Sequence, residues 1–525
     1  MGSVNTNAKA IALDFASISF LATAIRIIIG FPRKIFFALI LGTEGFGLIR
    51  INDMLMKYSS YFDLGMRLSA TRQIPLAQES NSNEELKIIR TIFSWTLLNS
   101  FLFVAIVWTL LLSGVDFFGF LTYNNLIIIS LSIFLSKFVI YFNSLSKGFG
   151  EYGIIGNHKL ISSILSPTVY FPLVYFFNVF GFLLSMLILN IFSFAYFSYY
   201  LSRTYSIFSN LVISLKDIIF YLKIGFVLWA VQTSQSFFWI IGITLVSFFL
   251  TADDVGLYGF AVGVFTIALS LGAPIRTVLF REMLLKKAKE KNSDGNLKTL
   301  SKYLKNPFAA YLLVMTISLG VLYFINELLI RLFIQDFTLS IEIIKILIIG
   351  YFFFSSNSIT NSVLNVADRQ SLRLGILTVG LILNLTLGLF SIQFGYGLLG
   401  VAWASTVGLY ILSFLFMHYS FKMVFGSHKQ GFLINMKTTF LFIIIYSVLI
   451  SLDSWQINIE LMAAANLSQV SFFNEIFITS IKIFLFILTT MFLYTLIFYK
   501  EKPVSEVFIS AKYIFNKSVI KKSSN

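Results

Sequence analysis

The sequence predicts an all-α polytopic membrane protein, and three observations lead to this fold class. Of the 525 residues, 57% are hydrophobic and only 12% are charged, whereas an ordinary soluble chain carries about 25% charged residues. Apolar runs of about twenty residues, each long enough to cross roughly 30 Å of hydrocarbon as a helix, recur along nearly the whole chain. Only short polar segments separate these runs, which leaves no room for a soluble domain between them.

Hydropathy predicts about fourteen transmembrane helices. They are centred on residues 13–40, 46–66, 91–113, 125–146, 160–179, 181–201, 224–250, 255–276, 307–325, 342–366, 374–394, 398–419, 436–453 and 474–499. The chain begins without the short apolar core and the small-residue cleavage site of a secretory signal. We therefore expect the first helix to stay in the membrane as an anchor.

The basic residues indicate the orientation. With the N-terminus in the cytoplasm, Lys and Arg gather in every second loop, namely 67–90, 147–159, 203–223 and 281–305. The opposite loops, such as "GTEGFG" (42–47) and "NVFGF" (178–182), are poor in both, with Arg331 as the main exception. We therefore expect both termini to be cytoplasmic and attribute the net charge of +15 to topology rather than to nucleic-acid binding.

The chain also contains an internal repeat. Residues 41–73 align with residues 250–282 without a gap, which places Gly47 on Gly256. Two further pairs follow at nearly the same separation: 143–153 with 361–371, and 181–187 with 400–406. Each match is weak alone, but their common order and spacing favour a true repeat.

The repeat unit contains about six helices, an even number, so both copies cross the bilayer in the same direction. Parallel repeats of this kind are typical of transporters in which two lobes rock around a central cavity, with the substrate site between them near the midplane. The expected domains are an N-terminal lobe (1–215), a C-terminal lobe (216–425), two additional transmembrane helices (426–499) and a basic cytoplasmic tail (500–525).

Cations in the first two spans indicate the site. The first span contains "RIIIGFPRKIFF" (26–37), and the second places Arg50, Asp53 and Lys57 on one helical stripe. A cation in mid-helix costs roughly 2.5–3.5 kcal/mol when it faces lipid, so a water-filled cavity is the favoured location. The candidate substrate-binding residues are Arg26, Arg33, Lys34, Arg50 and Lys57.

Structural explanations remain open for these residues. Arg26 can form an ion pair with Asp14 or Asp53, and the cations near the helix ends can extend to the interface. Candidates for ion coupling or charge balance are Asp14, Asp53 and Asp63. Three isolated lysines are expected near helix ends or on cavity walls: Lys137, Lys345 and Lys482. The three histidines are scattered and there is no cysteine, so neither a metal site nor a cofactor is expected.

Three motifs carry a resemblance to a known family. They are "ALILGTEGFGLIR" (38–50), "DDVGLYGFAVGVFTIALSLGAP" (253–274) and "FGYGLLGVAWASTVGLY" (394–410). In these residues the chain resembles the multidrug/oligosaccharidyl-lipid/polysaccharide (MOP) exporter superfamily, and within it the polysaccharide transporters of the O-antigen flippase type. The stretch "RIIIGFPRK" (26–34) is also similar to the start of the lipid II flippases, where arginines on the first helix face the central cavity. That likeness implies that Arg26 and Arg33 contact the substrate.

The resemblance implies a flippase rather than an enzyme. Its substrate would be an oligosaccharide linked through pyrophosphate to a polyprenyl lipid, moved from the inner to the outer leaflet of a bacterial-type cell membrane. Membrane lipids and polysaccharide assembly enzymes are the other implied partners. The alternatives are a lipid II flippase, a drug/cation exporter of the same superfamily, and a membrane polysaccharide polymerase or ligase. An exporter of cations should present carboxylates, and the longest outer loop (453–473) lacks the clustered acids that a polymerase or ligase needs.

Overall fold

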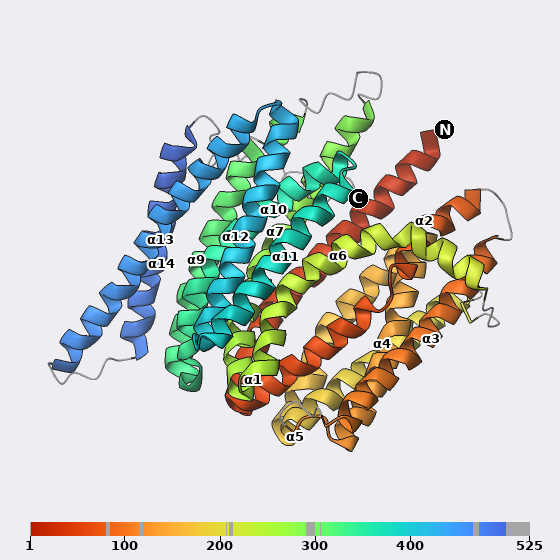
Figure 1. The fold of residues 1–525 in the computed structure, drawn as a ribbon, viewed down its shortest axis with the longest axis horizontal. Coiled ribbons are helices and arrows are strands. Elements are labelled where there is room, and N and C mark those ends of the chain that lie inside the picture. Colours follow the sequence, from red (N-terminus) through yellow and green to blue (C-terminus); the bar gives the residue numbers. More distant parts are fainter. Residues whose placement is uncertain are drawn as a thin grey trace, which may run out of the picture. The chain divides into compact units, whose positions relative to one another are not determined.

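The computed structural model is entirely helical over the residues that it describes (Figure 1). The described residues are 2–79, 84–114, 119–205, 207–208, 214–289, 300–304, 306–465 and 472–499. Their side chains are described too, except for 2–29, 31, 79, 111, 271–282, 284–289, 302–303, 456–465 and 472–473. Twelve helices within these ranges are long and apolar enough to cross a membrane. The predicted all-α polytopic fold is therefore confirmed.

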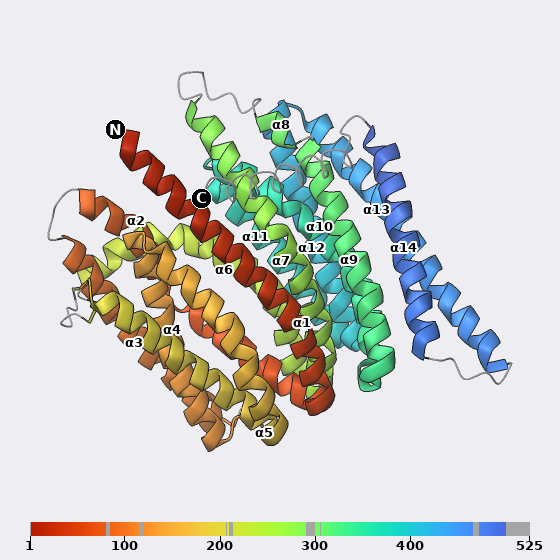
Figure 2. The same ribbon diagram turned by 180° about the vertical axis from the view of Figure 1, so that it is seen from behind.

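The chain forms two compact units, residues 1–260 and 261–525. The first contains α1 (Gly2–Tyr61), α2 (Met66–Glu79), α3 (Glu84–Leu112), α4 (Tyr123–Phe149), α5 (Tyr152–Ser202), α6 (Leu215–Phe249) and the start of α7 (Ala252–Lys289). The second contains the rest of α7, α8 (Ser301–Leu304), α9 (Asn306–Phe333), η2 (Gln335–Phe337), α10 (Leu339–Val366), α11 (Gln370–Gln393), α12 (Gly397–Phe425), α13 (His428–Ala465) and α14 (Phe472–Ile497). Figure 2 shows the same helices from behind.

Two helices, α1 and α5, each consist of two arms joined by a sharp reversal. The reversal in α1 is at Gly42 (φ 65°, ψ −172°), where Figure 1 shows the chain turning back on itself, and that in α5 is at Asn178 (φ 50°, ψ −130°). The arms of α5 lie side by side: the Ser185 hydroxyl of one arm donates a hydrogen bond of 3.4 Å to the Val169 carbonyl of the other. When the two arms of α1 and of α5 are counted separately, the twelve candidate helices give fourteen segments, which agrees with the predicted number of about fourteen.

Helix α2 lies within the stretch 67–90, which the charge pattern predicts as a loop. Met66, Ala70, Ile74 and Ala77 recur at helical spacing, and all four are buried in the core of the first unit. Helix α2 packs on α3, α4 and α6. The connection between these two spans is therefore partly helical, and α2 is not among the helices long and apolar enough to cross a membrane.

The aligned glycines of the repeat meet where α1 and α7 cross. A Cβ on Gly47 would lie 2.0 Å from the carbonyl oxygen of Ala252, and a Cβ on Gly256 would lie 2.0 Å from that of Thr43. Thr43 and Ala252 are themselves equivalent in the repeat alignment. The contact is thus reciprocal, as at a two-fold interface, and only glycine allows the two backbones to approach this closely.

In the second unit, α10 packs between α9 and α12, and most of its side chains are buried. Helix α11 packs on α12. The two C-terminal helices attach through α13, which packs on α12, and through α14, which packs on α9.

Ion pairs connect these C-terminal helices to the rest of the second unit. Lys482 Nζ of α14 lies 3.9 Å from Glu327 Oε2 of α9, and Lys345 Nζ of α10 lies 2.8 Å from Asp453 Oδ2 of α13. The Tyr323 hydroxyl of α9 donates a hydrogen bond of 2.9 Å to Asp453 Oδ1. The sequence suggested that Lys345 and Lys482 are isolated, but both form ion pairs. Their partners lie in distant spans, so they could not be recognised from the neighbouring residues.

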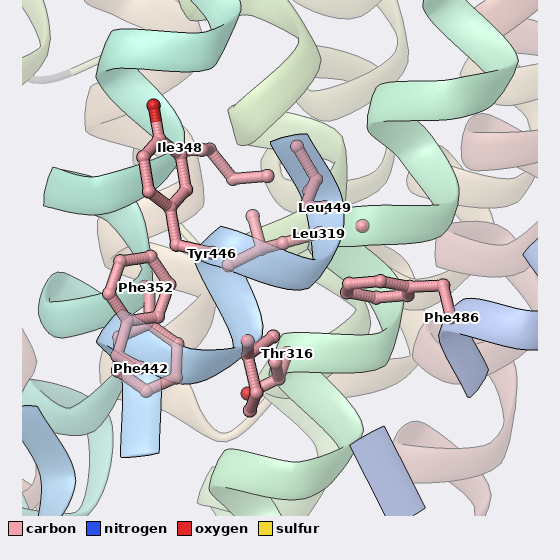
Figure 3. A pocket seen from close by; sticks show the side chains of 10 residues that line it. Thr316, Leu319, Ile348, Phe352, Phe442, Tyr446, Leu449 and Phe486 are labelled. Atoms are coloured by element: carbon pink, nitrogen blue, oxygen red, sulfur yellow. The ribbon is translucent and has the colours of Figure 1, made fainter. Parts of the chain in front are cut away.

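The same four helices enclose a small cavity of about 10 Å³ (Figure 3). Its walls are apolar apart from two hydroxyl-bearing residues, Thr316 and Tyr446. The rings of Phe352 and Phe442 stack in its wall with centroids 4.1 Å apart. Because a buried water needs both space and several polar partners, the interior beside the ion pairs is dry.

Candidate functional site

The two arms of α1 bring four of the predicted site residues together. Lys34 on the first arm lies within electrostatic range of Arg50, Arg33 and Asp53. Lys34 thus lies near two other cations and one carboxylate. The side chains of Arg26 and Asp14, which belong to the same prediction, lie outside the described residues.

Arg33 points from α1 toward the first arm of α5. Its Nη1 donates a hydrogen bond of 2.6 Å to the Ser166 hydroxyl. Its guanidinium carbon lies 5.2 Å from the centre of the Tyr170 ring and 5.8 Å from that of Phe37. Stacking and hydrogen bonding hold the charged group in one orientation.

Arg50 is held by three neighbours. Its Nη1 forms a 3.0 Å ion pair with Asp53 Oδ2, and its guanidinium carbon lies 4.7 Å from the centre of the Phe46 ring. Its aliphatic part packs on Gly259, where a Cβ would come within 2.5 Å of Arg50 Cγ. The Nε of Arg50 is buried and has no hydrogen-bond acceptor among the described residues. A buried guanidinium donor without an acceptor is costly, so it favours an incoming anion.

Lys57, the third member of the predicted stripe, lies apart from this cluster. Its side chain is exposed, and no ion pair within 4 Å joins it to any described residue. Arg50 and Asp53 therefore pair as their i, i+3 spacing predicts, while Lys57 does not share the carboxylate.

Asp63 lies in a second, separate polar site beyond the end of α1. Its Oδ2 accepts a hydrogen bond of 3.2 Å from the Arg67 amide and lies 3.6 Å from Arg67 Nε. The Asp63 carbonyl accepts a hydrogen bond of 3.2 Å from Trp95 Nε1. Burial raises the pKa of the Asp63 carboxyl above its ordinary value, although the nearby charge of Arg67 opposes this.

The second site includes a lysine that sequence reasoning did not place there. Lys137 of α4 is 7% exposed and lines the same pocket as Asp63 and Arg67. Its position in the middle of the predicted span 125–146 was the available signal, since a cation there needs a polar neighbour. That neighbour, Asn99 of α3, is uncharged and gives no comparable signal in the sequence.

Two histidines that look scattered in the sequence lie together. His418 Nε2 is 3.0 Å from His428 Nδ1, because α12 and α13 are joined by a short turn. The pair supplies two ligands, and no group of three His, Cys, Asp or Glu side chains in the described ranges could hold a metal ion.

Comparison with known proteins agrees with these features. The family described as "Polysaccharide biosynthesis protein" matches residues 13–280. A Shigella flexneri protein named "Putative O-antigen transporter" is 32% identical over 148 residues, which span 27% of this chain and 35% of that protein. The match thus covers about a third of the relative's length.

Solved structures share the fold. The lipid II flippase MurJ in an inward closed conformation has a TM-score of 0.64 at 16% identity, covering 92% of this chain and all of that one. An inward-facing multidrug resistance MATE family transporter of the MOP superfamily has a TM-score of 0.61 at 12% identity, covering 75% of this chain and 93% of that one. At these identities the likeness concerns the fold alone.

The helical fold is shared with a transporter of the MOP superfamily and with a lipid II flippase, in agreement with the resemblance carried by the three motifs. The chain belongs to the polysaccharide biosynthesis protein family. The relatives named above are transporters and flippases rather than polymerases or ligases.

Proposed function

We propose that the protein is a flippase that moves polyprenyl-pyrophosphate-linked oligosaccharide from the inner to the outer leaflet of a bacterial cell membrane. Two lobes, 1–215 and 216–425, alternate around a central cavity, and both termini are cytoplasmic. Family membership and the O-antigen relative support the substrate class. The fold shared with a lipid flippase supports the type of transport.

The observation that carries this proposal is the Arg50 guanidinium on the hairpin of α1, whose buried Nε has no hydrogen-bond acceptor among the described residues. Lys34 lies within electrostatic range of this guanidinium and of Arg33, so cations gather at this position. Guanidinium groups in fixed orientations are well matched to the oxygens of pyrophosphate. An exporter of cationic drugs would need the opposite balance of charge. The cations therefore serve as a temporary counter-charge for the headgroup.

The test is an assay in proteoliposomes for the appearance of a labelled polyprenyl-pyrophosphate oligosaccharide in the outer leaflet. Arg50→Ala is expected to reduce the rate about 10- to 100-fold, because a charge-assisted hydrogen bond contributes about 1.5–3 kcal/mol. Arg72→Ala is the matched control, since Arg72 is exposed on α2, and should transport at the wild-type rate. Equal rates for the wild type and both variants would remove Arg50 from the substrate path. Failure of the well-folded wild type would refute the proposed substrate.

Transport is expected to respond to the membrane potential. Outward transfer of each negative charge from a negative interior gains about 2.3 kcal/mol per 100 mV. A valinomycin-imposed potassium gradient, negative on the donor side, should therefore accelerate transport, and the opposite gradient should slow it. Equal rates under both gradients would show that charge movement does not drive the cycle.

A lipid II flippase is the second candidate, because the alignment with MurJ covers that whole chain. Lipid II carries the same pyrophosphate and polyprenyl groups, so the hairpin of α1 fits both substrates. Transport of each substrate in the presence of the other, in the same proteoliposomes, distinguishes the two candidates. The substrate that is transported at the lower concentration is the better assignment.

A further inference from the structure

The polar pocket beyond the end of α1 is distinct from the cationic hairpin. It lies between α1, α2, α3 and α4 in the first unit and has a cavity of about 20 Å³. That volume is enough for one particle of the size of water. The lining side chains are Ser59, Ser60, Asp63, Arg67, Thr96, Asn99, Lys137, Ile140 and Tyr141.

Lys137 contributes a buried positive charge to this cavity. Its Nζ donates to the Asn99 carbonyl at 3.3 Å and also to the Asn99 side-chain oxygen, and it lies 5.4 Å from the centre of the Phe103 ring. An ammonium group has three N–H donors, so these two acceptors leave one for the contents of the cavity. No carboxylate in the described ranges lies within ion-pair distance of Lys137. A buried cation in this situation is poorly compensated.

The other charges of the pocket nearly cancel. Asp63 pairs with Arg67 through Nε and the backbone amide, whereas the Nη groups of Arg67 donate to no described residue. Besides this pair and Lys137, the lining includes one titratable side chain, Tyr141, whose hydroxyl donates to the Ile207 carbonyl at 3.0 Å. The lining residues of α1 and α3 are uncharged. Lys137 thus adds one positive charge to a small cavity that Arg67 also lines.

We propose that this pocket binds one small monovalent inorganic anion, such as chloride, held by Lys137 and the Nη groups of Arg67. The lining of this pocket includes none of Arg33, Lys34 and Arg50, so the site is separate from that of the transported headgroup. The anion neutralises Lys137 and stabilises the packing of α2, α3 and α4. This assignment does not depend on the proposed transport activity.

The test uses bromide, a halide that quenches tryptophan fluorescence on contact, with the purified full chain in detergent. Trp95 is the reporter, because its Nε1 donates to the Asp63 carbonyl. Since the chain contains six tryptophans, the site-specific signal is the saturable quenching that is lost in Trp95→Phe. We expect saturable quenching in the wild type that chloride displaces and inorganic phosphate at the same ionic strength does not.

Variants separate binding from structural damage. Lys137→Met should abolish the saturable quenching, whereas Lys147→Met, an exposed lysine on the same helix, should retain it. Asp63→Asn should tighten bromide binding several-fold, because it removes the one negative charge of the pocket, and destabilisation alone cannot produce this gain.

Since burial raises the pKa of Asp63, wild-type affinity should rise as the pH falls and Asp63 is protonated, while Asp63→Asn should lack this dependence. Absence of saturable quenching in the wild type, or unchanged affinity in folded Lys137→Met, would overturn the proposal.

Discussion

Alanine at Gly47 or Gly256 is expected to destabilise the protein strongly. The new Cβ would lie 2.0 Å from a backbone carbonyl oxygen, Ala252 for one variant and Thr43 for the other. Relief requires α1 and α7 to move apart, because a backbone atom cannot rotate away as a side chain can. Overpacking costs about 1–3 kcal/mol where side chains yield, and we expect the upper end or more here. The melting temperature in detergent measures the loss.

Gly375→Ala is the matched control for this prediction. Gly375 lies within α11, and an added Cβ would meet no atom within 4 Å. Alanine is a better helix former than glycine by about 1 kcal/mol, so this variant should keep or slightly raise the melting temperature. If all three variants melted together, the close crossing of α1 and α7 would contribute nothing to stability.

The crossing also shows how far the repeat could be predicted. The alignment of Gly47 with Gly256 follows from the sequence. That the two residues touch does not, because equivalence in a repeat places residues symmetrically about an axis without giving their distance from it. That contact is known only from the short distances of each glycine to the backbone of the other helix.

The helices themselves were predictable because each must be apolar and long enough for the bilayer. The predicted loops 42–47 and 178–182 even begin at the residues where α1 and α5 reverse, Gly42 and Asn178. Helix α2 was not predicted, since hydropathy finds spans and α2 is too polar to be one. The sequence does indicate α2, but through apolar residues at helical spacing on one face (Met66, Ala70, Ile74 and Ala77) and not through a continuous apolar run.

The partners of the charged side chains could not be predicted in the same way. A membrane helix is apolar on the faces that meet lipid as well as on those that meet protein, so periodicity does not tell which way it faces. Arg50 and Asp53 are neighbours on one helix, and their pair was predicted. Arg33 and Ser166, 133 residues apart, are joined only by the packing of α1 on α5.

Removal of the buried lysine of α14 is the second change with a large expected effect. Lys482 is completely buried, and its partner Glu327 is 3% exposed. Lys482→Leu would leave the Glu327 carboxyl beside the buried carboxyl of Asp453 with one cation fewer. Breaking a buried ion pair costs about 3–5 kcal/mol when the remaining charge is uncompensated. Arg331 stays paired with Glu327 at 3.0 Å, so we expect the lower end of this range. We expect a corresponding fall in the melting temperature of the purified protein.

The double variant distinguishes this charge effect from a packing defect. Glu327→Leu combined with Lys482→Leu removes both buried charges, and Arg331, the other partner of Glu327, is 29% exposed and can be solvated. The small cavity between the same helices has mostly apolar walls, with which leucine is compatible (Figure 3). The double variant should therefore be more stable than Lys482→Leu alone, a non-additivity that a mere loss of packing would not produce. Lys429→Leu, at an exposed position of α13, should change stability by less than about 0.5 kcal/mol. If the double variant were the least stable of the three, the ion pair would itself be what attaches α14 to α9.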